Sequence, residues 1–590
     1  MRIAITGIGA VSAIGMNCTQ TLDALLNERS GLGVMHQLRS AHAELVVGEV
    51  PFSNEQLRAL LNIGAEPLPR TSLLGIAAAR EALAMAKLQP SNSMAFISGT
   101  TVGGMDLTEQ HWSDYAEGKA AEFIRLHEAG ESTIAIARHL TNAQILNAQI
   151  LNDQMVNDQM VNIFTPSTAC SSALNAIILG ANLIRTGQVK QALVGGSESL
   201  SRFHLNGFNT LMILDAQPCR PFDADRHGLN LGEGAGYIVL ENEEDAIRRG
   251  ATILGYIAGY ANTCDAFHQT ASSENGEGAY LAMTKALEMA HLQPADIDYV
   301  NAHGTATPNN DLSESAALKR VFGDAMPLVS STKAFTGHTT SASGGLETVI
   351  CLIAMQHRFV PANLNWSHSA DGLITPYTQH PTPYTLHHVL CNAFGFGGNE
   401  SSLILSDAPV ELSEAAFRHA QVVVSTEQND DADLAQYVSP AEARRMTPQM
   451  RRIVAAAKRA LEEAQIELPD AIVCATQWGC MLQSMRFLQE MIERDEQQLK
   501  PTPFIQSTHN TIASLIAILT GNHGYNSTYS QGKQSLRCAL RDVETQMSLG
   551  LINNALVLEF DEQVEAWDNV LQLIHDHTDN IAKAYVLIAK

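Results

Sequence analysis

The sequence has no long apolar run, and its cysteines follow no recognisable spacing. Apolar stretches such as 348–354 are too short to span a bilayer. The first residues, Met1-Arg2-Ile3-Ala4, enter a strand pattern without the layout of a signal peptide. The nine cysteines are scattered, with neither a disulfide framework nor zinc-ligand pairs. We therefore expect a soluble cytoplasmic protein with reduced thiols, no membrane span and no metal.

Basic residues are also few. Lysine and arginine together number 37, against 62 aspartates and glutamates, which gives a net charge of −25. Because this charge would repel a phosphate backbone, we expect no nucleic-acid partner. The chain has 590 residues, 45% of them hydrophobic, so its length allows about two to four domains with separate cores.

Cys170 is the first candidate for chemistry. It lies between a strand-like segment, 162–165, and an apolar stretch of helical character, 173–184. The first N–H groups of a helix are unpaired and its dipole favours negative charge, so a thiol at this turn is expected to ionise and react readily. The alternative is a small buried hydrophobe, which is a common role of free cysteine.

Two histidines follow strand signals in a similar way. His303 lies in the segment 299–308 and His338 in the segment 331–338, and each precedes a predicted helix. We expect both to meet Cys170 at one end of a sheet, close to a glycine-rich loop. A structural hydrogen bond is the alternative role for each histidine.

The order of these motifs resembles that of the β-ketoacyl-acyl-carrier-protein synthases of the thiolase superfamily, especially the elongating type. The similarity runs from Arg2 to Leu405, about two thirds of the chain. It implies an α/β, thiolase-like fold with duplicated αβαβα layers. The segments that carry the resemblance are 2–9, 167–174, 220–223, 232–236, 299–308, 331–338, Glu347 and 394–398.

The resemblance implies a two-step reaction. Family members transfer an acyl chain from a carrier-protein thioester to the cysteine, here Cys170, and then decarboxylate malonyl-carrier protein to obtain the carbanion that attacks the acyl group. His303 and His338 would donate hydrogen bonds to the malonyl thioester oxygen, a role that suits a neutral imidazole. Lys333 and Glu347 would form the supporting ion pair.

The resemblance also implies roles for the glycine-rich loop and for the residues that contact the substrate arm. The backbone N–H groups of Cys170 and Phe396 would form the oxyanion hole, and Phe396 would gate the acyl pocket. Thr305 and Thr307 would hold the pantetheine arm of an acyl carrier protein, and no cofactor is implied. The loop continues as 397–400, Gly-Gly-Asn-Glu, where the family usually has Gly-Gly-Thr-Asn, so the hydrogen bonds beside the oxyanion hole are expected to differ.

About 180 residues follow the last strand expected of the synthase, and they predict a third half-unit of the same type. Segment 550–557 resembles segment 187–194 of the first half, and this alignment, carried back without a gap, places Lys533 on Cys170. We divide the chain into an N-terminal synthase half (1–245), a C-terminal half (246–407), a linker (408–419) and an inactive third unit (420–590).

A synthase half without a nucleophile resembles a chain-length factor, the inactive partner of a synthase in polyketide and aryl-polyene assembly. The alternative is a decayed duplicate that is kept for packing, and Cys538 is expected in its core. Synthases of this family pair through their first halves. The third unit could therefore take the partner's place within one chain, as a pseudo-heterodimer, or it could be an appendage of a homodimer.

Arginines crowd the first helices predicted in the third unit: Arg444, Arg445, Arg451 and Arg452. Because the carrier protein is acidic, docking needs a local basic patch in this acidic chain, and we hypothesise that these residues supply it. A solvated helix face is the alternative.

Four pentapeptides in tandem precede the nucleophile. Asn142–Leu146 is repeated at once, and Asn152–Val156 is then repeated too. We interpret this stretch as an expanded loop between helix and strand, which costs little entropy. The alternative is a functional role near the dimer surface.

The sequence thus predicts a 3-oxoacyl-acyl-carrier-protein synthase in fatty-acid, polyketide or aryl-polyene elongation, with the third unit favouring the aryl-polyene context. Two other functions remain open, a non-catalytic chain-length partner and a thiolase-like acyltransferase that does not decarboxylate. A non-catalytic partner would not need the complete set of candidate catalytic residues. The two histidines favour decarboxylative condensation, because thiolases use one histidine and a second cysteine. Pocket depth is expected to depend on Met105, Phe203, Phe208 and Phe396.

Overall fold

The computed structural model describes residues 1–91, 93–116, 119, 125–140, 162–413, 418–428, 431, 434–562 and 580–590. Within these residues a ten-stranded sheet has the order β10-β9-β11-β12-β8-β1-β7-β6-β4-β5, and a five-stranded sheet has the order β13-β17-β16-β14-β15. The larger sheet consists of two five-stranded halves joined through β1 and β8. Its strands are β1 (Ile3–Ser12), β4 (Met94–Gly99), β5 (Ile163–Phe164), β6 (Gln191–Glu198), β7 (Gly234–Asn242), β8 (Gly255–Cys264), β9 (Tyr299–Asn301), β10 (Leu328–Ser330), β11 (His388–Gly395) and β12 (Asn399–Ser406).

Helices cover both outer faces of the synthase halves and fill the space between them. Helix α3 (Arg70–Ala86) packs on β1 and β7, and α13 (Glu277–Ala290) packs on β8 and β12. Helices α10 (Ser172–Arg185) and α16 (Ser343–His357) lie between the halves and contact each other. Every residue of α10 is buried, which explains its apolar sequence. The predicted αβαβα layers are therefore present.

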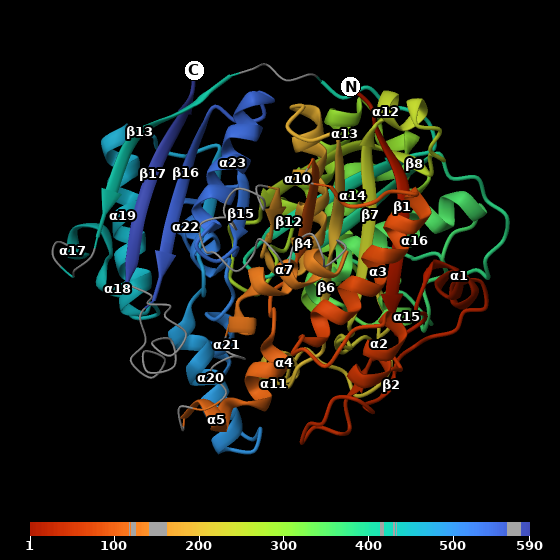
Figure 1. The fold of residues 1–590 in the computed structure, drawn as a ribbon, viewed down its shortest axis with the longest axis horizontal. Helices are drawn as coiled ribbons and strands as arrows, with labels where there is room; N and C mark the ends of the chain where they lie inside the picture. The colour runs from red at the N-terminus through yellow and green to blue at the C-terminus, as the bar shows by residue number, and fades with distance from the viewer. Residues whose placement is uncertain are drawn as a thin grey trace.

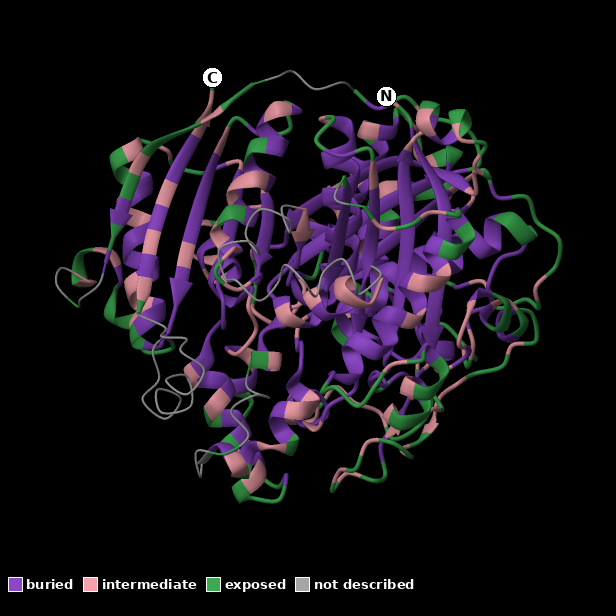
Figure 2. Ribbon diagram, viewed as in Figure 1, coloured by how far each residue is buried: buried purple, intermediate pink, exposed green. Residues whose placement is uncertain are grey.

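The third unit repeats the first half. Its strands are β13 (Ala420–Glu427), β14 (Ala471–Ala475), β15 (Tyr525–Tyr529), β16 (Asn554–Asp561) and β17 (Ile581–Ala589). Helix α19 (Pro448–Ala464) packs against β13 and β17, whereas α23 (Ser535–Ser548) packs against β14 to β16 and also reaches α10. Figure 1 shows this unit in blue beside the synthase halves, and Figure 2 shows that their strands are buried while β13 exposes much of its length.

A strand contact joins the third unit to the first half. The N–H of Ser167 donates to the carbonyl of Thr528 at 2.8 Å, and the N–H of Ser530 donates to the carbonyl of Thr165 at 3.0 Å. The two bonds link equivalent positions of the segment after β5 and of the end of β15, as a local two-fold axis requires. The third unit therefore lies on the first half in the way that two related subunits would lie on each other.

The strand-to-helix turn recurs with the same backbone in all three units. Ala169, Thr340 and Gly532 have positive φ angles of 54°, 46° and 56°, and a helix starts three residues later in each unit. Non-glycine residues rarely adopt this conformation. The residue that follows Gly532 is Lys533, in the place that Cys170 has after Ala169, so the structure agrees with the predicted alignment.

Helix α23 differs from α10 on one face. Arg537 and Glu544 are exposed in α23, where α10 has the buried Leu174 and Ala181 at the corresponding positions. In the synthase half this face is covered by the C-terminal half, because the main chain of Leu174 lies against Gly344 of α16. The third unit thus carries charge where a second half would pack, while Cys538 lies in the core as predicted.

Some predictions concern segments that the structure does not describe. The pentapeptide repeats at 142–161 and residues 414–417 of the linker lie outside the described residues. All nine cysteines are buried and unbridged. In the described part of the chain, no helix has the length and apolar character needed to cross a membrane.

Candidate active site

The sulfur of Cys170 lies at the turn before α10 and is buried. His338 Nε2 is 3.1 Å from Sγ, and the backbone N–H of Phe396 faces the sulfur. Burial raises the pKa of Cys170 to about 12, although the charge of Lys333 and the Phe396 N–H act in the opposite direction. The expectation of a readily ionised thiol is therefore wrong, because desolvation outweighs the helix N-terminus.

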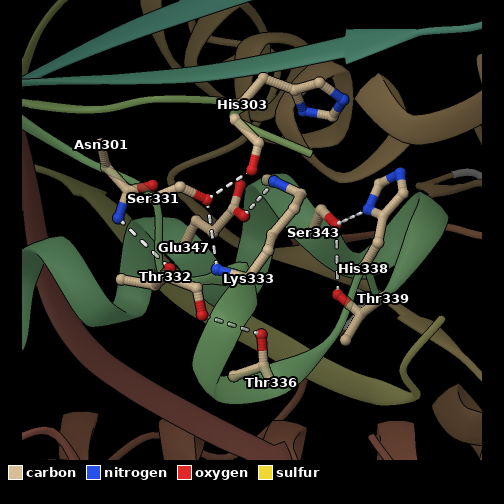
Figure 3. A network of polar contacts seen from close by, with 12 residues as sticks. Asn301, His303, Ser331, Thr332, Lys333, Thr336, His338, Thr339, Ser343 and Glu347 are labelled. Carbon is tan, nitrogen blue, oxygen red and sulfur yellow. Dashed lines mark hydrogen bonds and ion pairs between the residues drawn. The ribbon is translucent and has the colours of Figure 1, made fainter. Parts of the chain in front are cut away.

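The two histidines and the lysine predicted from sequence lie close together, beside Glu347 (Figure 3). His303 and His338 line the same cavity as Cys170, and the charge of Lys333 acts on its thiol. The rings of His303 and His338 are edge to face with centroids 5.3 Å apart. His338 Nδ1 lies 3.0 Å from Ser343 Oγ, which fixes its ring. His303 Nδ1 is buried without a hydrogen-bond partner among the described residues.

Lys333 and Glu347 form a buried ion pair, with Nζ and Oε1 2.5 Å apart. Burial, and next the positive charge of Lys333, lower the pKa of both His303 and His338 well below the ordinary value. Both imidazoles are therefore neutral at neutral pH. A neutral imidazole can accept a proton or donate one hydrogen bond, which is what the predicted chemistry requires.

A tunnel of about 320 Å³ leads from the surface to the sulfur. Thr305 and Thr307 lie in its wall, and their hydroxyl oxygens are 2.9 Å apart. His303, His338, residues 395–398 and Glu400 line the same tunnel. The polar groups of its wall suit an arm that carries amide and hydroxyl groups.

A second cavity, of about 50 Å³, begins on the other side of Cys170. The ring of Phe396 stacks on that of Phe208 at 5.4 Å, and both residues line the tunnel and this second cavity. Phe396 is therefore placed between the two spaces, as a gate would be. The residues predicted to set pocket depth, Met105, Phe203, Phe208 and Phe396, all line the cavity.

The far wall of this cavity comes from the third unit, and the sequence did not reveal it. The contributing residues include Trp478, Phe504 and His509. Phe504 packs on the ring of Phe208 with centroids 5.6 Å apart, and His509 Nδ1 lies 2.8 Å from Ser167 Oγ, three residues before the nucleophile. The internal duplication was the only available signal, because it implies that the third unit meets the first half at the nucleophile turn.

Asn399 explains the unusual loop sequence. Its Oδ1 accepts a hydrogen bond from Ser171 Oγ at 2.8 Å, and its Nδ2 donates to the carbonyl of Asn526 in β15 at 2.6 Å. Gly395 approaches the nucleophile turn so closely that a Cβ there would lie 2.8 Å from the carbonyl oxygen of Thr168. The loop is thus tied both to the nucleophile turn and to the third unit.

The four arginines proposed for docking fall into two pairs. Arg444 and Arg445 are exposed and line a groove of about 530 Å³, together with His268, which also lines the tunnel. Arg451 donates to the carbonyl of Ala443, and Arg452 forms an ion pair with Asp431 at 2.9 Å. The first pair is therefore free to meet a partner beside the tunnel, whereas the second pair holds local structure.

Comparison with known proteins gives the family. Residues 1–246 match "Beta-ketoacyl synthase, N-terminal domain" and residues 254–367 match "Beta-ketoacyl synthase, C-terminal domain". The chain belongs to the β-ketoacyl synthase family. A further "Beta-ketoacyl synthase, N-terminal domain" match covers residues 417–587, so this synthase carries an extra N-terminal-type unit. The α/β thiolase-like fold with an additional C-terminal unit is confirmed.

The relatives of this synthase are condensing enzymes. The 3-oxoacyl-acyl-carrier-protein synthase 2 of Vibrio cholerae is 32% identical over 431 residues, which cover 68% of this chain and 98% of the relative. Among solved structures, the ishigamide ketosynthase/chain length factor has 30% identity and a TM-score of 0.62 over 69% of this chain and 99% of its own. The PfaC keto synthase-chain length factor has 16% identity, so it shows the fold alone, with a TM-score of 0.77 over 100% of this chain and 78% of its own.

These similarities establish an enzyme of the condensing, acyl-transferring class. They also relate the third unit to the N-terminal half of a synthase, since the model of that domain matches residues 417–587. The fold similarity to PfaC likewise extends over the whole chain.

Proposed function

We propose that this protein is a 3-oxoacyl-acyl-carrier-protein synthase that elongates acyl chains by decarboxylative condensation and uses its third unit as a built-in chain-length factor. The observation that carries the proposal is the cavity behind Cys170, whose near wall belongs to the first half and whose far wall belongs to the third unit. A decayed duplicate that is kept only for packing would have no reason to enclose the acyl site.

The first step is transfer of the acyl group to Cys170. Sγ attacks the thioester carbonyl while its proton passes to His338 Nε2, 3.1 Å away. The N–H groups of Cys170 and Phe396 stabilise the oxyanion that forms. The pantetheine sulfur leaves and takes the proton from His338, which returns the imidazole to its neutral form.

The second step uses the same imidazoles as donors. His303 and His338 donate hydrogen bonds to the thioester oxygen of malonyl-carrier protein, and the enolate charge that forms as carbon dioxide leaves is stabilised there. The enolate carbon then attacks the acyl carbonyl, and the Cys170 sulfur is expelled as a thiolate, which takes up a proton from solvent in the tunnel. The buried Lys333–Glu347 pair keeps a positive charge near both rings, which holds them neutral.

The rings around the cavity support a planar, unsaturated acyl chain, in aryl-polyene or polyketide elongation, over a saturated fatty acid. Phe203, Phe208, Phe504 and Trp478 all line it, and flat π-systems stack well against such rings. The acyl group trapped on Cys170 in cells, identified by mass spectrometry, tests this preference. A saturated chain would refute it and leave ordinary fatty-acid elongation.

The proposed chemistry is tested with malonyl-carrier protein and acyl-carrier protein as substrates. Wild type should release carbon dioxide and form the 3-oxoacyl product, whereas Cys170→Ala should form no product and Cys170→Gln should still release carbon dioxide. Retention of full condensation by Cys170→Ala would exclude Cys170 as the nucleophile. Absence of carbon dioxide release from wild type would favour the thiolase-like or the non-catalytic alternative.

We further propose that the chain is its own pseudo-heterodimer. The segment just after β5 already pairs with the end of β15 through two main-chain hydrogen bonds around Pro166 and Tyr529, so the third unit takes up the place beside β5 where a partner subunit would pair. Light scattering should give a mass near 63.7 kDa. A stable species of twice that mass would support the homodimer with appendages.

The acyl carrier protein is proposed to dock on the groove beside the tunnel mouth. Arg444 and Arg445 offer positive charge there to an acidic partner. The double charge reversal of these two to Glu should raise the KM for carrier protein several-fold at low salt. Reversal of Arg451 and Arg452 is the matched control, with a smaller effect expected because those side chains are engaged locally.

A further inference from the structure

One buried carboxyl in the tunnel wall has no assigned role. Glu400 is the second residue of β12, pairs across the hairpin with Phe394 of β11, and is only 3% exposed. It lines the tunnel that also contains Cys170 and His303. Its Oε2 is buried without a hydrogen-bond partner among the described residues. An unsatisfied buried oxygen is costly, so its presence in a substrate channel calls for a ligand.

The neighbouring carboxylates are different, because the main chain holds them. Asp265 accepts hydrogen bonds from the N–H and the hydroxyl of Ser273, each at 2.7 Å. Glu314, in α14 (Pro308–Phe322), accepts from the N–H groups of His303 and Gly304 at 2.8 and 2.7 Å. Both residues shape loops of the site, which leaves Glu400 as the carboxyl with capacity to bind.

The surroundings keep this carboxyl protonated. Burial raises the pKa of Glu400 well above its usual range, and the charges of Asp265 and Glu314 raise it further. Among the described residues, no basic side chain forms an ion pair with Glu400 that would lower its pKa. A protonated carboxyl offers one O–H donor and one carbonyl acceptor.

We propose that Glu400 is a positioning residue for the carrier's arm, in which its carboxyl O–H donates a hydrogen bond to an amide carbonyl of the pantetheine group in the tunnel. The inference rests on the proposed function, since that function brings a pantetheine thioester past Glu400. Thr305 and Thr307 line the same tunnel, so the arm would meet polar partners on more than one side. The substrate class selected is a thioester that carries amide groups, as opposed to a simple alkyl thioester.

The test compares wild type with Glu400→Leu and Glu400→Gln in the full chain. The reaction is acylation of Cys170, followed by intact-protein mass spectrometry, with acyl-pantetheine and with the same acyl group as an ethanethiol ester. Glu400→Leu should lose about ten-fold in kcat/KM with acyl-pantetheine, the effect of one hydrogen bond. It should lose nothing with the ethanethiol ester, which has no amide. Equal losses with both esters would overturn the proposal.

The pH profile gives a second readout that a purely structural role would not move. As the pH rises through the pKa of Glu400, the carboxyl ionises and loses its donor, so the KM of wild type for acyl-pantetheine should rise. Glu400→Gln keeps an N–H donor and does not titrate, and its KM should stay low and flat. The same alkaline rise in Glu400→Gln would refute the assignment.

These outcomes can be separated from failure of the proposed function. If wild type were not acylated on Cys170 by either ester, the proposed condensing activity itself would be wrong. If wild type is acylated and all three proteins behave alike with both esters, only the role of Glu400 is refuted. Glu400→Gln retains the size of the side chain, so the test remains decisive if Glu400→Leu does not fold.

Discussion

Truncation of Phe504 in the third unit should lengthen the product made at Cys170 in the first half. Phe504 is 3% exposed, and its ring lies 5.8 and 5.6 Å from the rings of Phe203 and Phe208, at the far wall of the acyl cavity. Phe504→Ala removes a phenyl ring from the lining of a cavity of about 50 Å³. The growing chain can then enter the vacated space.

The magnitude follows from burial of apolar groups. Each condensation adds two carbons, and burying about two more methylene groups at about 0.8 kcal/mol each gives about 1.6 kcal/mol. The kcat/KM for an acyl chain one extension longer than the longest wild-type substrate should therefore rise about fifteen-fold. The same substitution should lower the free energy of unfolding by about 3–5 kcal/mol, because it leaves a cavity in a packed cluster.

Phe487→Ala is the matched control for the loss of packing. Phe487 is fully buried, contacts Phe203 edge to face at 5.1 Å and Phe504 at 5.7 Å, and lies outside the residues that line the cavity. It should cost similar stability and leave chain length unchanged. Products are measured by mass spectrometry of the carrier-bound acyl chains, and stability by urea denaturation. Identical product distributions for both variants would refute a chain-length role for this wall.

Three further results are expected. Glu496 of the third unit accepts hydrogen bonds from the first half, including one from Arg202. Glu496→Gln should therefore lower the free energy of unfolding, measured by urea denaturation, by about 1.5–3 kcal/mol. The control Glu493→Gln, at an exposed residue, should change it by less than about 0.5 kcal/mol. Lys333→Met should lower the free energy of unfolding by about 3–5 kcal/mol, because Glu347 is left buried without its counter-charge. The double variant Lys333→Met with Glu347→Leu should regain stability but not condensation activity. Because the pKa of His338 is lowered, the rate of Cys170 acylation should stay constant as the pH falls from 8 to 6 and decline only when His338 is protonated and can no longer accept the thiol proton. Lys333→Met should move that decline to higher pH, and an unchanged profile would exclude the charge effect.

The convergence of the proposed catalytic residues could be predicted from sequence because each of them lies in a short motif whose backbone conformation is set locally. Cys170 follows a turn residue with positive φ, His303 follows the end of β9, and His338 follows the short helix (Lys333–Thr336) that comes after β10. The sheet therefore brings them together without information from distant parts of the chain. The third unit was predictable for the same reason, since its turn repeats at Gly532. The order of the motifs therefore predicts the fold and the approximate position of the site.

The properties that depend on packing could not be predicted. The ionisation of Cys170 was predicted wrongly, because the helix N-terminus is visible in the sequence whereas the burial that raises the pKa of the thiol is not. Trp478 and Phe504 reach the cavity only through the pairing of two units that are far apart in sequence. Asp431, which neutralises Arg452, is likewise visible only in the folded chain. Each of these depends on a neighbour from another element.

The main-chain pairing of the segment after β5 with the end of β15 fixes the stoichiometry of the two units at one to one. Two separate subunits meet at a rate and extent set by their concentrations, whereas a tethered unit faces its partner at an effective concentration in about the millimolar range. Cys170 and the far wall of its cavity are therefore parts of one polypeptide, and no separate subunit has to bind to bring them together. A substitution in this wall is inherited together with Cys170, because one gene encodes both.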